Sequence, residues 1–260
     1  MKKKHYPQTY LQSLVLIIFP LFFVSPFVFL RKLIFFTENI FAITLFGIYF
    51  FALLIFYFFK NDKQINFNFK INKIIILLIL LIFFFQVGIH VPLNLYLYGF
   101  NASELSKINT TFIISQFIAL IITAIIEEFI FRGMILKGYL MKYKPIKAII
   151  VSAVFFGIIH LNPLQIFGAI TLGLITGYVY YYSKSIGITI ILHVLYNITA
   201  YVFIFLKNNY VFLKIKKTSN SYEFYSKYTI IISFLIFVYL LYYVSKNKNN
   251  IIVKLKKLDN

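Results

Sequence analysis

The sequence predicts an all-α, polytopic integral membrane protein with about eight transmembrane helices. Hydrophobic residues make up 61% of the 260 residues and the mean hydropathy is +0.87. Only 13% of the residues are charged, about half the share found in a soluble globular domain. Apolar runs as long as a bilayer-crossing helix recur along the chain. There is no Cys, which excludes disulfides, thiolate metal ligands and a Cys nucleophile.

The predicted membrane segments follow one another with short loops between them. The first follows MKKKH and is interpreted as an uncleaved span, because it has bilayer length and lacks a small-x-small cleavage site. The fifth is short; it either starts deeper, tilts, or forms a hairpin with the sixth at Asn162-Pro163, where Pro favours a break. The segments are Leu11 to Leu30, Ile40 to Phe59, Ile74 to Val91, Phe112 to Phe131, Ala148 to His160, Leu164 to Tyr182, Ile186 to Leu206 and Tyr228 to Val244.

Small residues at Ala169, Gly173 and Gly177 recur at every fourth position of the sixth segment. A helix with such a stripe can approach a neighbouring helix closely. We expect close packing of this segment and assign no further role to the stripe.

The net charge of +19 comes mainly from Lys in short loops and at the ends of the chain. This distribution indicates topology charges and contacts to anionic lipid, not nucleic-acid binding. It predicts that both termini are cytoplasmic, and the Ile, Lys, Asn and Phe bias suggests a bacterial cytoplasmic membrane. The loop from Lys207 to Lys227 does not follow this pattern, because it carries five Lys on the predicted outer side.

Two adjacent carboxylates stand inside the fourth apolar run, which reads IITAIIEEFIFRG from Ile121 to Gly133. A charge at the centre of a membrane helix is disfavoured by roughly 2.5 to 3.5 kcal/mol, so such residues are rare and usually functional. The chain has 7 acidic residues, and the five besides Glu127 and Glu128 fall at or outside the ends of apolar runs. Those five are Glu38, Asp62, Glu104, Glu223 and Asp259.

The spacing within this run assigns different tasks to the two carboxylates. Glu128 precedes Arg132 by four residues, the favourable order for an ion pair on one helix face. We predict a structural ion pair there. Glu127 lies about 100° round the helix and is not used by this pairing. It is therefore the candidate general base.

Three more polar residues lie at comparable depth in other membrane segments. His160 ends the fifth segment, while His193 and Asn197 share one face of the seventh. Counted from the predicted cytoplasmic loops, Glu127, His160 and His193 all lie roughly 14 to 20 Å from the inner surface. We therefore predict an active site between the fourth, fifth and seventh segments. The other histidines are interpreted as interfacial or hydrogen-bonded residues, and they are His5 and His90.

These residues form three motifs in order along the chain. Glu127 to Arg132 fits EExxxR, Phe156 to His160 fits FxxxH, and His193 to Asn197 fits HxxxN. The pattern resembles the CPBP family of intramembrane proteases, also called the Abi or CAAX protease family, which includes the type II CAAX prenyl endopeptidases. It covers Thr123 to about Ala200. We expect a catalytic core over residues 111–206, preceded by about three transmembrane helices in 1–110 and followed by a loop, a last helix and a basic cytoplasmic tail in 207–260.

The resemblance implies a role for each matching residue. Glu127 activates a water molecule with help from His160, and His193 with Asn197 stabilises the oxyanion of the tetrahedral intermediate. Glu128 with Arg132 holds the site. No metal is the preferred interpretation; the alternative is a catalytic zinc held by Glu127, His160 and His193.

The resemblance also implies a partner class, a peptide or protein substrate in or at the membrane. Two other classes stay open at this point. Intramembrane Glu and His also serve proton-coupled transporters. A non-catalytic immunity or partner-binding protein could keep the same scaffold, since the family is linked with bacteriocin self-protection.

Overall fold

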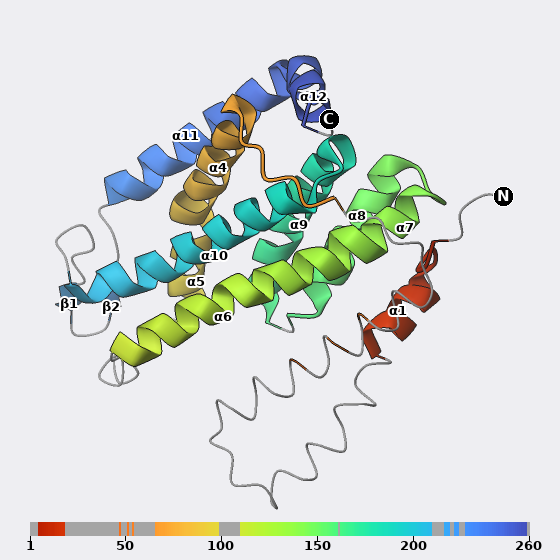
Figure 1. Ribbon diagram of the computed structural model, residues 1–260. Helices are drawn as coiled ribbons and strands as arrows, with labels where there is room; N and C mark the ends of the chain where they lie inside the picture. Colours follow the sequence, from red (N-terminus) through yellow and green to blue (C-terminus); the bar gives the residue numbers. More distant parts are fainter. Residues whose placement is uncertain are drawn as a thin grey trace, which may run out of the picture. The chain divides into compact units, whose positions relative to one another are not determined.

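The computed structural model of the chain describes residues 5–18, 47, 51, 54, 66–98, 110–160, 162–209, 216–218, 221–223 and 227–258. Most of these residues are helical, and the two short strands form one hairpin, as drawn in Figure 1. They divide into two compact units. Unit 1 comprises Met1–Ile65 with Phe129–Ala148, and unit 2 comprises Asn66–Glu128 with Ile149–Asn260.

Unit 1 is held together by contacts between its N-terminal segment and the stretch around Gly138. The Tyr139 hydroxyl donates to Ser13 Oγ over 2.7 Å, and the Tyr10 and Tyr139 rings meet edge to face with centroids 5.7 Å apart. Gly138 is needed here, because a Cβ at this position would collide with the backbone oxygen of Pro7. The helices of this unit are α1 (Tyr10–Ile18), the π-helix η3 (Phe129–Leu136) and α7 (Lys137–Leu140), and α8 (Pro145–Ile158) begins in it.

His5, ahead of α1, is a hydrogen-bonded residue of unit 1. Its Nε2 lies 3.3 Å from the carbonyl oxygen of Met134. Burial lowers the pKa of His5 to about 4; the charge of Lys137 adds to this, and the Met134 hydrogen bond opposes it. The ring is therefore neutral near pH 7 and donates Nε2–H to the carbonyl. This agrees with the interpretation of His5 as a hydrogen-bonded residue.

Unit 2 holds the remaining elements, together with α8 from Ile149 onward. In chain order they are α4 (Lys73–Phe85), the π-helix η1 (Gln86–His90), α5 (Val91–Tyr98), α6 (Thr110–Glu128), α9 (Pro163–Ser183), α10 (Ile186–Asn209), β1 (Lys216–Thr218), β2 (Ser221–Glu223), α11 (Lys227–Lys246) and α12 (Lys248–Lys256). The two strands pair antiparallel, with Lys216 opposite Glu223.

Helix α10 is the centre of unit 2. It packs against α6, α9 and α4, and Figure 1 shows it running alongside α6. Helix α11 packs against α4 and η1, and the C-terminal α12 contacts α9 and α4. Because α10 contacts α6, α9, α4 and η1, side chains from several elements can meet along it.

The helices of unit 2 begin and end at recognisable signals. Asn72 caps α4 by accepting from the backbone N–H groups of Ile74 and Ile75, and Asn162 caps α9 in the same way with Pro163 at its first turn. Helix α9 ends at Lys184, whose φ of 50° is left-handed. The predicted break at Asn162-Pro163 is confirmed.

Small residues let α9 pack closely against α8, as the sequence predicts for Gly173. A Cβ added at Gly173 would lie 3.0 Å from the Cα and Cβ of Ala153 on α8. On the other helix, a Cβ at Gly157 would collide with the side chain of Ile170. The two helices interlock where each offers a glycine to the other.

The π-helix η1 interrupts the third apolar run. Pro92 follows directly, and its ring nitrogen cannot donate to the carbonyl of Gly88 four residues earlier. Gly88 also allows α11 to approach, since a Cβ there would lie 2.7 Å from the backbone nitrogen of Phe234. The membrane segment predicted from Ile74 to Val91 lies within the candidate span Lys73–Asn94, and η1 is a π-helical turn inside it.

By length and composition, three described helices can cross a membrane: Lys73–Asn94, Pro163–Ser183 and Tyr228–Lys246. Two shorter apolar helices are Pro145–Ile158 and Ile186–Thr199. Most of the segments Ile40 to Phe59 and Leu11 to Leu30 lies outside the described residues, so the count of eight spans stays a prediction. The predicted basic tail after Val244 is in fact partly helical, because α12 follows α11.

Candidate active site

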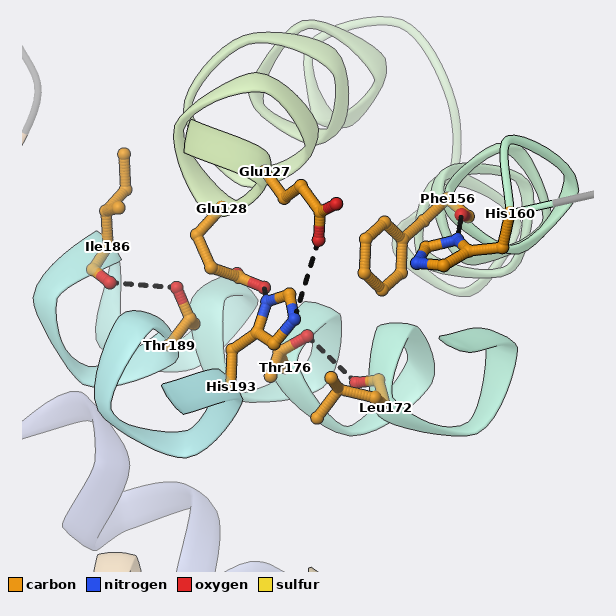
Figure 2. A network of polar contacts seen from close by, with 9 residues as sticks. All are labelled: Glu127, Glu128, Phe156, His160, Leu172, Thr176, Ile186, Thr189 and His193. Carbon is orange, nitrogen blue, oxygen red and sulfur yellow. Dashed lines mark hydrogen bonds and ion pairs between the residues drawn. The ribbon is translucent and has the colours of Figure 1, made fainter. Parts of the chain in front are cut away.

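The last turn of α6 and the second turn of α10 place two carboxylates beside one imidazole. His193 Nδ1 lies 2.9 Å from Glu128 Oε1, and His193 Nε2 lies 3.5 Å from Glu127 Oε2. Figure 2 shows the His193 ring between the ends of the two glutamates. An ionised carboxylate can only accept a hydrogen bond, so Nδ1–H donates to Glu128 and Nε2 faces Glu127. We call Glu127, Glu128 and His193 the acidic cluster.

The three side chains differ in how far they are open to the surroundings. The Glu128 side chain is 0% exposed and the His193 side chain 3% exposed, whereas that of Glu127 is 17% exposed. A reacting molecule can therefore reach Glu127 most easily. Glu128 is placed to hold the ring of His193 from behind.

Helix geometry explains how neighbouring glutamates serve one ring. Successive residues point about 100° apart on a helix, so the two carboxylates cannot approach the same atom from the same side. In the acidic cluster they meet the two different nitrogens of His193. The sequence places all three residues in one site, but it does not show that Glu128 and His193 would bond across two helices.

Two buried threonines near the cluster use their hydroxyl groups within their own helices. Thr176 on α9 donates to the carbonyl oxygen of Leu172 over 2.8 Å, and Thr189 on α10 donates to that of Ile186 over 2.9 Å. Figure 2 includes both bonds. These hydroxyl protons are therefore directed to backbone oxygens and not to the acidic cluster.

His160 lies beyond the end of α8, in the turn that leads to α9. Its Nδ1 donates to the carbonyl oxygen of Phe156 over 2.9 Å. The Phe156 ring meets His160 edge to face at 5.2 Å and His193 edge to face at 5.6 Å between centroids. Phe156 thus contacts both histidines, as Figure 2 shows. The proposed help of His160 to Glu127 stays a prediction.

Two other predicted site residues are described without a test of their roles. Asn197 lies one turn after His193 on α10 and is partly buried. Arg132 is buried and belongs to unit 1, within the π-helix η3. The expected α-helical spacing from Glu128 to Arg132 is wrong, because the helix changes to π form at Phe129. The ion pair between Glu128 and Arg132 stays a prediction.

The residues of the zinc alternative do not form a ligand set in this structure. Within the described ranges, no three His, Asp or Glu side chains are grouped so that they could hold a metal ion. Glu127 and His193 are close together, but His160 directs its Nδ1 to the Phe156 carbonyl oxygen. No step of the mechanism proposed below passes through a metal.

A second buried polar cluster lies in unit 2, and its members were not predicted to act together. His90 Nδ1 lies 2.7 Å from Gln86 Oε1, and His90 Nε2 lies 3.2 Å from the carbonyl oxygen of Leu164. Gln86 Nε2 donates to the carbonyl oxygen of Tyr196 over 3.2 Å, and the Tyr196 hydroxyl lies 3.4 Å from His90 Nδ1. We call Gln86, His90 and Tyr196 the glutamine cluster. The i, i+4 spacing of Gln86 and His90 was the one sequence signal for it.

Comparison with known protein families identifies the region that carries the motifs. Residues 109–199 match the family described as type II CAAX prenyl endopeptidase Rce1-like. The comparisons with curated proteins and with solved structures found no match. The matched stretch includes the acidic cluster, His160 and Asn197. The resemblance drawn from the three motifs is confirmed over residues 109–199, which are similar to the Rce1-like family of type II CAAX prenyl endopeptidases.

Proposed function

We propose that the chain is an intramembrane endopeptidase that hydrolyses a peptide bond in a membrane-associated peptide or protein. The match of residues 109–199 to the Rce1-like family supports a CAAX-type protease at a coarse level. The observation that carries the finer proposal is the acidic cluster, in which one buried imidazole is held between two carboxylates of unequal exposure. Two carboxylates and an imidazole at this spacing suit proton transfer.

In the proposed reaction, Glu127 takes a proton from a water molecule, and the resulting hydroxide forms a bond with the carbonyl carbon of the substrate. The carbonyl oxygen becomes an oxyanion, for which the proposed hydrogen-bond donors are the Asn197 amide and the doubly protonated His193, which donates from Nε2–H while Nδ1–H stays bonded to Glu128. The carbon–nitrogen bond then breaks, and Glu127 delivers its proton to the leaving amine. The products are a carboxylic acid and an amine, so atoms and charges balance.

Glu128 has a supporting role in this proposal. Its hydrogen bond to Nδ1 sets the orientation of the His193 ring, so that Nε2 points toward Glu127. In hydrolases with a Ser-His-Asp triad, the Asp carboxylate orients the imidazole in this way. The substrate contacts neither Glu128 nor Nδ1.

The proposal is tested by replacing Glu127, the most exposed carboxylate of the acidic cluster. The membrane peptidomes of cells that express the wild type, Glu127→Ala and Glu127→Asp are compared. Gln165→Ala, an exposed position on α9 outside the acidic cluster, is the control for substitution as such. We expect cleavage products that appear with the wild type and with Gln165→Ala, and that are absent with Glu127→Ala. Glu127→Asp keeps the carboxylate at a shorter reach and should retain a small fraction of the activity.

Other outcomes point to the two remaining classes. Identical peptidomes with the wild type and with Glu127→Ala would overturn the protease proposal. In that case, Glu127-dependent ion flux in reconstituted vesicles favours a proton-coupled transporter. Bacteriocin resistance that survives Glu127→Ala favours an immunity protein that acts by binding alone.

A further inference from the structure

Four helix ends of unit 2 lie close together at one end of its membrane-crossing helices. Helix α4 begins there, α9 ends there, and α10 begins directly afterwards. The extended residues 66–72 join these ends, because Ile186 N donates to Asn66 O over 3.0 Å. The side chain of Asn68 donates to Leu258 O over 2.8 Å, and that of Asn72 to Lys254 O over 3.3 Å. The end of α11 and the whole of α12 therefore lie at this same end of unit 2.

This end of unit 2 must lie at a membrane surface. Among the described residues, three helices are long and apolar enough to span a bilayer, and each begins or ends there: Lys73–Asn94, Pro163–Ser183 and Tyr228–Lys246. Such helices end where the hydrocarbon core gives way to the headgroups. The surface formed by the ends of these helices therefore faces the lipid headgroups.

This surface carries a dense and uniform positive charge. Eight lysines are exposed on it, and we call them the lysine face: Lys70, Lys73, Lys184, Lys246, Lys248, Lys254, Lys256 and Lys257. The described residues 66–73, 184–187 and 246–258 include no Asp or Glu. Lys184 Nζ lies 4.6 Å from the centroid of the Tyr181 ring, as expected of a lysine at a membrane interface beside an aromatic ring.

Apolar side chains stand among these lysines. On α12, Ile251 and Leu255 are buried against the unit while Val253 is 53% exposed. In the extended stretch 66–72, Phe67, Phe69 and Ile71 are 47%, 54% and 55% exposed. The asparagines that alternate with them bond to the protein and leave these apolar side chains outward. Basic and aromatic side chains side by side are typical of segments that insert into the headgroup boundary of anionic membranes.

We propose that the lysine face binds the headgroups of anionic lipids in the leaflet that this end of unit 2 reaches. The lysines supply charge for the phosphate groups, and Phe67, Phe69 and Ile71 enter the upper acyl region. An acidic protein partner fits the charge but not the exposed aromatic and aliphatic residues at membrane depth. The inference does not depend on the proposed catalytic chemistry, since no member of the acidic cluster takes part.

The test measures lipid retention by the purified full-length protein. Protein in detergent is mixed with equal amounts of phosphatidylglycerol and phosphatidylcholine of identical chains, and the bound lipid is counted by native mass spectrometry. We expect the wild type to retain phosphatidylglycerol preferentially, and less of it as salt increases. Each lysine near an anionic surface contributes roughly fivefold, so Lys→Gln at positions 248, 254, 256 and 257 together should lower this preference at least about tenfold.

Two matched variants separate the lysine face from charge in general. Lys→Arg at the same four positions keeps the charge and should keep the preference. Lys142→Gln with Lys144→Gln removes exposed lysines of unit 1 and should leave the preference within about twofold. Thermal unfolding verifies that α12 still folds in each variant. An undiminished phosphatidylglycerol preference in the Gln variant, or an equal loss in the unit 1 control, would overturn the proposal.

Discussion

Two polar clusters are buried along α10, three residues apart, and their hydrogen bonds end on different groups. In the acidic cluster, His193 contacts the side-chain carboxylates of Glu127 and Glu128. In the glutamine cluster, the contacts from Gln86 and His90 reach the backbone oxygens of Tyr196 and Leu164. The first cluster concentrates charge on side chains, and the second fastens η1, α9 and α10 to one another through the backbone.

We interpret the acidic cluster as a reactive site and the glutamine cluster as a structural contact between helices. Carboxylates within a membrane protein are energetically costly and usually functional, so we interpret the acidic cluster as the candidate reactive site. Amide and imidazole groups that are satisfied by backbone oxygens mainly hold helices together, and in membranes such bonds are worth about 0.6 kcal/mol on average. Of the side chains compared, Glu127 is 17% exposed, whereas Glu128 in the same cluster and Gln86 in the glutamine cluster are fully buried. We therefore expect mutations in the two clusters to affect different measured quantities.

After the loss of products expected for Glu127→Ala, the largest effect should come from His193, which belongs to the acidic cluster alone. His193→Gln removes the imidazole whose Nε2 faces Glu127. We expect it to lower kcat/KM about 10³-fold, the usual effect of losing an acid–base group. Single-turnover cleavage of a membrane peptide by reconstituted protein measures this, and thermal unfolding verifies the fold. A variant with near wild-type kcat would show that the acidic cluster is a structural feature like its neighbour.

The next effect sharpens the comparison at adjacent residues of α10. Asn197→Ala should reduce kcat on the order of 100-fold by removing an oxyanion donor, while the melting temperature changes little. Tyr196→Phe is the matched control one residue earlier, and its kcat should stay within about threefold of the wild type. If the two variants exchanged these behaviours, the assignment of Asn197 to catalysis and Tyr196 to structure would be reversed.

A smaller effect, on stability only, is expected in the glutamine cluster. Gln86→Leu keeps the volume but leaves His90 Nδ1 and the Tyr196 carbonyl without the amide, which should lower the free energy of unfolding by about 1 to 3 kcal/mol. Activity per folded molecule should not change. The measurement is unfolding by denaturant in detergent beside kcat on the same sample. Loss of kcat with unchanged stability would move Gln86 into the catalytic machinery.

The acidic cluster could be predicted further from the sequence than the glutamine cluster. Counting residues from the ends of apolar runs places Glu127 and His193 at one depth, and the structure brings them within 3.5 Å. Helical spacing within one run cannot reveal a bond between helices, so the partnership of Glu128 with His193 was not predicted. The helix changes to π form at Phe129, which alters the direction of the Arg132 side chain from that of a regular α-helix. Helix α8 ends at Ile158, so His160 lies in the following turn and not on the helix as expected.

The helix boundaries show the same division between local and distant information. The starts of α4 and α9 follow from side chains a few residues away, Asn72 and Asn162. The π-helix η1 and the glutamine cluster depend on α9, α10 and α11, which lie about 70 to 150 residues further along the chain. Sequence periodicity in one run carries no signal of such contacts. His90 accordingly looked like an isolated hydrogen-bonded residue.

The smallest expected effect concerns metal ions. Among the described residues, no three His, Asp or Glu side chains are arranged so that they could hold a metal ion. In the acidic cluster, both nitrogens of His193 face carboxylates. We therefore expect exhaustive dialysis of the purified protein against a strong chelator to leave kcat within about twofold. Activity lost to the chelator and restored by zinc alone would show that His160 moves to join Glu127 and His193 as a third ligand. The acidic cluster would then differ from the glutamine cluster in the ion it holds, and not only in its charge.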